Sequence, residues 1–252
     1  MFSNKYIFIY SAVMVILVAL MLSLAATILQ PYQQRNLDVE KMKDILGAAH
    51  IVAETRVIPA VYEKYVVEEV VVDVQGNVVS SFSEGKFDSG DIRAFDINLK
   101  DQLKSIQTSG NGMLPLYVIQ YYDEKLYIIP LLGRGLWGAI WGTIALKEDF
   151  STVAGITFGH KGETPGLGAE ITTPVFQKQF DNKQIFNEQG EFTSVKVVKG
   201  GVKNSKNVPE IHGVDGISGG TITSDGTSQM IENCLRNYLP YFNKMKNNGT
   251  EE

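Results

Sequence analysis

The chain has 252 residues, 44% of them hydrophobic and 20% charged, which are ordinary proportions for a folded domain with one apolar segment. Its net charge of −5 excludes nucleic acid as a partner, because a phosphate backbone requires a basic face. The single cysteine, Cys234, excludes an intramolecular disulfide and a cysteine cluster around zinc or iron and sulfur.

An uncharged stretch from Tyr6 to Gln34 opens the chain, and its first part, to Leu29, is almost wholly apolar. At a rise of ~1.5 Å per residue this part reaches about 36 Å, enough to cross a hydrocarbon core of ~30 Å with a modest tilt. The sequence predicts a transmembrane helix at about residues 6–29 within an anchor of residues 1–32, ended by Pro31. A cleaved signal peptide is the alternative, but the length of the apolar run favours a retained anchor.

The region after the anchor predicts an α+β fold, because strands and helices do not alternate regularly. We divide it into an N-terminal part (33–115), a second domain (116–243) and a polar, frayed tail (244–252). Apolar spacing predicts helices at 38–50 and around Ile231 to Leu239, the latter closed by Pro240. The expected strands are 65–73 paired with Val78-Val79, then 116–122, 125–131, 141–146, 153–158 and 192–198.

The most informative motif is the glycine-rich stretch from Asp215 to Ser224, directly ahead of the last predicted helix. Its glycines allow a sharp turn close to a ligand, and a helix start favours a phosphate. An anion is therefore expected near Thr221. The structural alternative is a plain turn in which Thr223, Ser224 or Asp225 caps the helix, and both interpretations can hold together.

Two further glycine-rich stretches lie upstream. Residues 163–170 read Glu-Thr-Pro-Gly-Leu-Gly-Ala-Glu, which predicts a tight loop whose amides bond the edge of a planar heterocycle with Leu167 against its face. Residues 133–142 place small residues beside two tryptophans, which suits an aromatic ligand or a partner. The alternatives are a surface turn and ordinary core packing. No stretch matches the dinucleotide or phosphate-loop fingerprint, so NAD or ATP binding is not predicted.

In this order the three stretches resemble the family of FMN-binding C subunits of the sodium-translocating NADH:quinone oxidoreductases. The resemblance covers nearly the whole chain, from the membrane helix and residues 33–46 to Gly-Leu-Trp, Glu-Thr-Pro-Gly-Leu-Gly and Ser-Gly-x-Thr. It implies one transmembrane helix followed by an α+β FMN-binding domain, one covalent FMN per chain, and electron transfer within a complex that expels sodium. The implied partners are the other subunits, the lipid bilayer, and a flavin transferase that uses FAD and magnesium.

The resemblance assigns roles to individual residues. Thr221 is the expected attachment point of the FMN phosphate, with Gly220 where the family usually has alanine. The other expected cofactor-binding residues belong to the attachment motif, the loop along the flavin ring and the Gly-Leu-Trp wall: Asp215, Ser218, Gly219, Gly220 and Thr223; Glu163, Thr164, Leu167 and Gly168; Leu136 and Trp137. No catalytic base and no metal site are expected, and His160 receives no role. The chain alone is not expected to oxidise NADH.

The resemblance also implies the bacterial inner membrane, with the flavin domain on the periplasmic side. The basic residues that follow the helix, Arg35, Lys41 and Lys43, favour a cytoplasmic domain instead, but acidic residues between them weaken that signal. Two rival functions remain open: the homologous flavin subunit of an ion-translocating ferredoxin:NAD oxidoreductase, and a non-redox anchored module whose glycine stretches only form turns.

Overall fold

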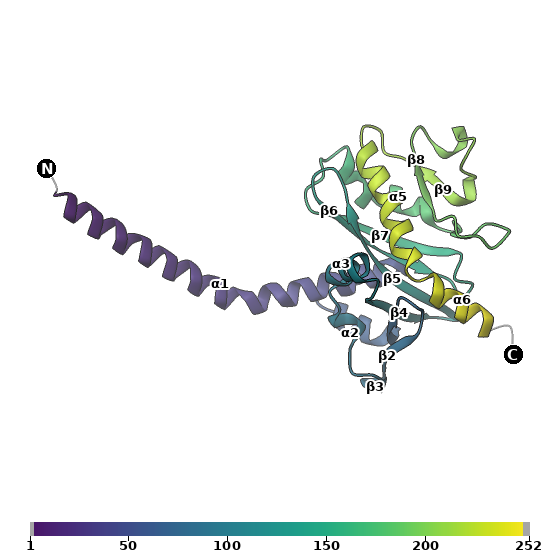
Figure 1. The fold of residues 1–252 in the computed structure, drawn as a ribbon, viewed down its shortest axis with the longest axis horizontal. Coiled ribbons are helices and arrows are strands. Elements are labelled where there is room, and N and C mark those ends of the chain that lie inside the picture. Colours follow the sequence, from purple (N-terminus) through teal and green to yellow (C-terminus); the bar gives the residue numbers. More distant parts are fainter. Residues whose placement is uncertain (1–2, 249–252) are drawn as a thin grey trace. The chain divides into compact units, whose positions relative to one another are not determined.

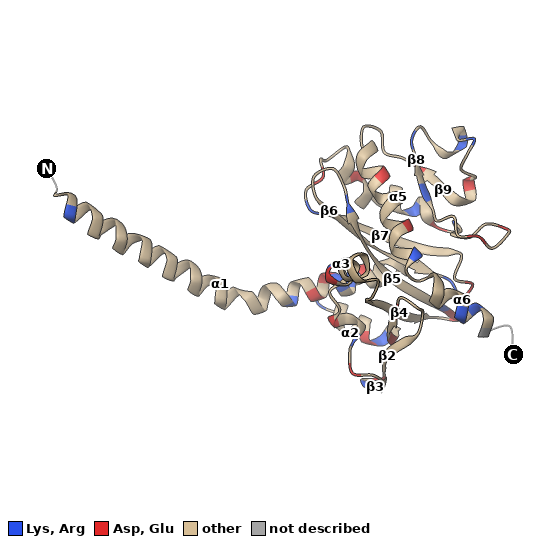
Figure 2. Cartoon of the chain, viewed as in Figure 1, with Lys and Arg blue, Asp and Glu red and all other residues tan. Residues whose placement is uncertain are grey.

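The computed structural model of the chain describes residues 3–248, which divide into two units between Met42 and Lys43. The first unit lies within helix α1 (Asn4–Ala48), and α1 is the one described helix long and apolar enough to cross a membrane. Its apolar side chains from Tyr6 to Leu29 are exposed, as contact with lipid requires. Figure 2 shows charged residues only toward the two ends of this helix.

The expected end of the membrane helix at Pro31 is wrong, because α1 continues through Pro31 to Ala48. A proline removes one backbone hydrogen bond and crowds the carbonyl four residues earlier, but the residues on both sides can remain helical. The predicted helix at 38–50 is therefore the last part of α1 and not a separate element. Its final turn belongs to the second unit, where Ile45 and Leu46 are buried.

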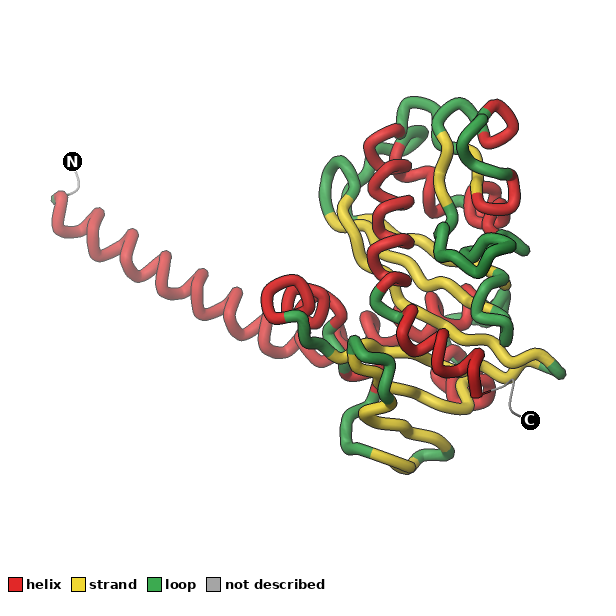
Figure 3. The backbone as a smooth tube through the Cα atoms, turned by 45° about the vertical axis from the view of Figure 1, so that its right-hand side comes forward, coloured by secondary structure: helices red, strands yellow, loops and turns green. Residues whose placement is uncertain are grey.

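The second unit is built on a seven-stranded antiparallel sheet with strand order β3-β2-β1-β4-β5-β6-β7 (Figures 1 and 3). Its strands are β1 (Val66–Asp73), β2 (Val78–Ser83), β3 (Lys86–Ser89), β4 (Met113–Tyr121), β5 (Glu124–Arg134), β6 (Ala139–Leu146) and β7 (Val153–His160). The α+β fold is confirmed, and five predicted strands lie in β1, β4, β5, β6 and β7. The expected hairpin after Asp73 also forms, because Asp73 accepts hydrogen bonds from Gln75 N and Asn77 N.

Helices cover both faces of this sheet, which explains why its central strands are apolar on consecutive residues. One face packs Leu116 and Ile129 against Ile231 and Leu235 of α5 (Thr221–Arg236) and against α6 (Leu239–Asn248). The alternate side chains face the opposite way, where Tyr117 contacts Tyr62 of α2 (Ile58–Tyr65). Figure 1 shows α5 and α6 lying across the first face. The other two α-helices of the described chain are α3 (Leu99–Ser109) and α4 (Pro174–Gln177), and five short 3-10 helices lie in the loops.

Three local expectations near the C-terminus differ from the structure. The strand expected at 192–198 shrinks to β8 (Lys196–Val198), which pairs in parallel with a short strand not predicted, β9 (Gly213–Asp215). Pro240 does not close a helix but is the second residue of α6, where a missing N–H costs nothing. Helix α6 reaches Asn248, so the tail expected from 244 is helical up to there, and residues 249–252 lie outside the described residues.

Candidate functional site

The start of α5 is the centre of the candidate site. Gly219 has φ +74°, a conformation that favours glycine, and Gly220 is the N-cap residue without a side-chain cap. Thr221 is the first helical residue and is half-buried. The first amides of α5 therefore have no side-chain acceptor at the cap, which makes this end favourable for a phosphate.

None of the three side chains expected to cap α5 does so. Ser224 Oγ accepts a hydrogen bond from Ile217 N at 3.2 Å, across the glycine turn. Thr223 is buried, and its hydroxyl donates to Glu163. Asp225 is exposed and makes no cap contact. The glycine turn is thus held by Ser224 from inside the helix, while the hydroxyl of Thr221 remains at the helix start.

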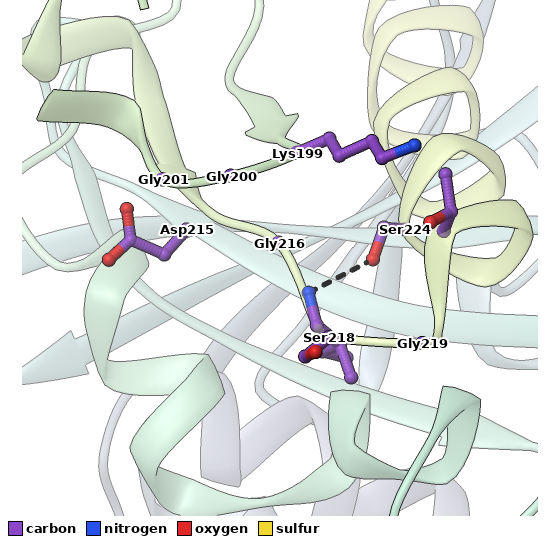
Figure 4. A pocket seen from close by; sticks show the side chains of 10 residues that line it. Lys199, Gly200, Gly201, Asp215, Gly216, Ser218, Gly219 and Ser224 are labelled. Atoms are coloured by element: carbon purple, nitrogen blue, oxygen red, sulfur yellow. Dashed lines mark hydrogen bonds between the residues drawn. The ribbon is translucent and has the colours of Figure 1, made fainter. Parts of the chain in front are cut away.

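A cavity of about 480 Å³ opens beside Thr221 (Figure 4). It is formed by the turn after β8 and by the glycine-rich stretch 215–224: Lys199, Gly200, Gly201, Asp215, Gly216, Ile217, Ser218, Gly219, Thr221 and Ser224. Figure 4 shows the Lys199 side chain extending toward α5, with Asp215 at the other side of the turn. The cavity brings together the hydroxyls of Ser218, Thr221 and Ser224, the Lys199 cation, the Asp215 carboxylate and several backbone groups. The hydroxyls, the cation and the backbone amides are groups that can donate hydrogen bonds to a phosphate ester.

Glu163 joins the three glycine-rich stretches at one point. Its side chain is 4% exposed, and the carboxylate accepts from Trp137 N at 2.8 Å and from Thr223 Oγ1 at 2.5 Å. A Cβ added to Gly135 or Gly168 would lie 2.6 Å or 2.4 Å from its carboxylate oxygens, so both glycines are required for this approach. Glu163 therefore holds the β5–β6 turn, the 163–168 loop and α5 together, and its carboxylate is not directed at a ligand.

Exposed apolar side chains surround this junction. Leu136 and Trp137 form the tip of the β5–β6 turn and are 48% and 66% exposed, and Leu167 is 41% exposed. A Cβ on Gly219 would lie 2.6 Å from Leu167 Cδ2, so the 163–168 loop contacts the turn that precedes Thr221. Large exposed apolar groups beside a phosphate-type cavity fit an aromatic ring attached to a phosphate. FMN, which combines the two, fits this arrangement.

The structure brings most of the predicted residues into one region and adds others. Thr164 is exposed in its loop, Gly168 is buried, and Ser218 and Asp215 line the cavity. The sequence interpretation missed Lys199, which also lines the cavity. The sequence signal that could have identified it is its position directly before the glycine pair Gly200-Gly201. The sequence interpretation also missed Ile222, which is 58% exposed one residue after Thr221.

Two further groups have structural roles. His160 Nδ1 accepts from Glu163 N at 3.1 Å, a contact that the sequence interpretation did not foresee. Burial raises the pKa of the Cys234 thiol to about 11, so this cysteine is a poor nucleophile. Among residues 3–248 no group of three His, Cys, Asp or Glu side chains could hold a metal ion.

Comparisons with known proteins agree with this site. Residues 135–236 match the FMN-binding domain family. The matched segment begins at the β5–β6 turn and ends with the last residue of α5. The chain is 31% identical to the C subunit of the Na(+)-translocating NADH-quinone reductase of Vibrio campbellii, over 92% of this chain and 91% of that protein. The same subunit of Haemophilus ducreyi is 31% identical over 92% of both chains.

Solved structures show the same similarity in three dimensions. The C subunit of the Na(+)-translocating NADH-quinone reductase from Parabacteroides distasonis has a TM-score of 0.72 and 36% identity, over 85% of this chain and 96% of that one. NqrC from Shewanella oneidensis has a TM-score of 0.65 and 26% identity, over 83% of this chain and 98% of that one.

Proposed function

The chain belongs to the family of C subunits of the Na(+)-translocating NADH-quinone reductases, and we propose that it carries FMN joined by a phosphoester to Thr221. As a member it is a subunit of an oxidoreductase complex, with an FMN-binding domain at 135–236. We further propose that its flavin relays electrons between other centres of the complex, which expels sodium. The relatives that carry the pump's name favour this complex over the ferredoxin-linked homologue.

The observation that carries the covalent attachment is the placement of Thr221. Its hydroxyl belongs to the first residue of a helix that has no side-chain cap, and it lines the same cavity as Lys199. Thr223, two residues on, is buried and its hydroxyl already donates to Glu163. Of these two threonines, Thr221 is therefore the one available to a transferase.

The roles of this chain's residues follow from their positions. FMN, when bound, supplies the redox chemistry, so the protein needs no acid or base at a substrate. The start of α5 and Lys199 would hold the phosphate, while Leu136, Trp137 and Leu167 would lie against the apolar ring. Glu163 fixes the mutual position of these groups, because it bonds to both Trp137 and Thr223.

The attachment is tested by purifying the chain from its native host, where a flavin transferase is present. We expect an intact mass increased by one FMN minus water, localised to the peptide that contains Thr221, and fluorescence that survives denaturing electrophoresis. A Thr221→Val variant should lose both signals, and Thr108→Val, which changes an exposed threonine of α3, should keep them. An unmodified wild-type chain would contradict the attachment and support a non-redox module.

We also propose that α1 anchors the chain in the bacterial inner membrane with the flavin domain in the periplasm. The length and apolar surface of α1 support its role as a membrane anchor. Membership of the family supports the placement of the flavin domain on the periplasmic side. Protease added to spheroplasts should degrade the domain that follows α1. A domain protected until the membrane is permeabilised would contradict the periplasmic placement.

A further inference from the structure

We propose that the Lys199 ammonium group is the counter-cation of the phosphate at Thr221 and that it binds this phosphate while the attachment forms. This inference rests on the proposed function, because it assigns a residue to the phosphate of that site. Among residues 3–248, Lys199 and Asp215 are the only charged residues that line the cavity beside Thr221. Without Lys199 the one charged side chain of the described residues that lines this cavity would be the Asp215 carboxylate, which would oppose the binding of an anion.

The charge of Lys199 is not committed to a protein partner. No carboxylate among the described residues forms an ion pair with Lys199, whereas Lys196, three residues earlier, pairs with Glu232. Lys199 is exposed at the cavity edge and extends toward α5 (Figure 4). An ammonium group with three donors in this position can bond phosphate oxygens without first breaking a salt bridge.

The backbone that carries Lys199 is fixed on both sides. Gly216 N donates to Val198 O at 2.8 Å, which joins the ends of β8 and β9. Asp215 Oδ1 accepts from Val202 N at 2.7 Å and so closes the turn that contains Gly200 and Gly201. Asp215 is therefore a positioning residue for this turn. The fixed turn limits the entropy lost when Lys199 binds an anion.

The chemical step places a charge where Lys199 can neutralise it. The Thr221 hydroxyl oxygen bonds to the flavin-side phosphorus of FAD while the bond from that phosphorus to the bridging oxygen of AMP breaks. AMP leaves with that oxygen and the hydroxyl proton is released, so the step needs no oxidant or reductant. Lys199 and the first amides of α5 would stabilise the negative charge on the flavin-side phosphate from two directions.

The test measures the rate of attachment, not electron transfer. Detergent-solubilised full-length chain from a host without flavin transferase is mixed with transferase, FAD and magnesium, and labelling is followed by gel fluorescence and intact mass. We expect Lys199→Gln to lower the initial rate about tenfold, the loss typical of one charge-assisted hydrogen bond. Lys199→Arg should restore the rate to within about threefold of wild type, since the charge is kept.

The matched control is Lys203→Gln, which removes the same charge from the same turn at an exposed residue that does not line the cavity. It should label at the wild-type rate, and all variants should unfold at the wild-type temperature. The role of Lys199 would be overturned if Lys199→Gln were labelled as fast as Lys203→Gln, or if Lys199→Arg were labelled as slowly as Lys199→Gln. In either case, labelling of the wild type would still support the proposed function. Wild type that remains unlabelled would overturn both.

Discussion

Thr223, in the first turn of α5, donates its hydroxyl to Glu163 Oε2 at 2.5 Å, although the two residues are 60 positions apart in sequence. The other oxygen of the same carboxylate accepts from Trp137 N at 2.8 Å. This buried pair fixes the helix start that carries Thr221 relative to the loops on which the apolar residues lie. It also distinguishes the two threonines: Thr223 is buried and bonded to Glu163, whereas Thr221 is half-buried at the helix start and is the proposed attachment point.

The two threonines should respond to substitution in opposite ways. Thr223→Val leaves the buried Glu163 carboxylate without one donor and should cost about 1–3 kcal/mol of unfolding free energy, while Thr221 still becomes flavinylated. Thr221→Val should abolish flavinylation and change stability by less than about 0.5 kcal/mol, because Thr221 is half-buried at a helix end. Denaturant unfolding and intact mass measure the two effects. Loss of attachment in a folded Thr223→Val chain would show that Thr223 serves the phosphate directly.

Gly226 should resist the substitution that normally improves a helix. Glycine to alanine inside a helix usually stabilises by about 1 kcal/mol. A Cβ on Gly226 would lie 2.3 Å from Arg134 O, so Gly226→Ala should push α5 away from β5 and destabilise the chain by about 1–3 kcal/mol. Gly162→Ala, whose Cβ would meet no atom within 4 Å, is the control. The thermal unfolding temperatures of both variants test this prediction. A Gly226→Ala chain more stable than wild type would show that α5 and β5 do not approach this closely.

Asp215 separates a hydrogen-bonding role from a charge role. Because its Oδ1 accepts from Val202 N, Asp215→Asn keeps an acceptor and should be flavinylated at a rate within about threefold of wild type. Asp215→Ala releases the turn and should be slowed about tenfold. Gel fluorescence over time measures both rates. If the asparagine variant is as slow as the alanine variant, the negative charge of Asp215 acts directly, for example in recognition by the transferase.

The ion pair between Lys196 and Glu232 should contribute stability only above acidic pH. The hydrogen bond from Lys196, opposed by partial burial and aided by Arg236, lowers the pKa of Glu232 below its ordinary value. The contribution is therefore present above the ordinary carboxyl pKa and disappears as pH falls through the lowered folded value. Lys196→Met should cost up to about 1 kcal/mol at neutral pH, since both groups are partly exposed.

The pH dependence of this cost identifies its cause. Urea unfolding of wild type and Lys196→Met at several pH values should give curves that converge once Glu232 is protonated. Lys203→Met, on an exposed residue of the neighbouring turn, should parallel wild type at every pH. A constant difference between wild type and Lys196→Met down to low pH would assign the cost to lost packing of the lysine stem.

The sequence alone determined the features that depend on local pattern. The uncharged apolar run predicts a membrane helix, alternating and β-branched segments predict β1 and β4 to β7, and glycines ahead of an amphipathic segment predict a turn before α5. The order of the three glycine-rich stretches was sufficient to indicate the family. The helix, strand and turn signals are readable because each depends on residues within one continuous segment of the chain.

Only the tertiary structure decided which residues meet. Nothing in the spacing of Glu163 and Thr223 reveals that they bond, and the turn that carries Lys199 reaches the cavity only because β8 and β9 pair in parallel over three residues each. Pro31 and Pro240 were misinterpreted because a proline changes one local hydrogen bond, whereas the continuation of a helix depends on the residues around it. Long-range contacts of this kind are set by how the sheet and helices pack, and that packing cannot be predicted from short segments of sequence.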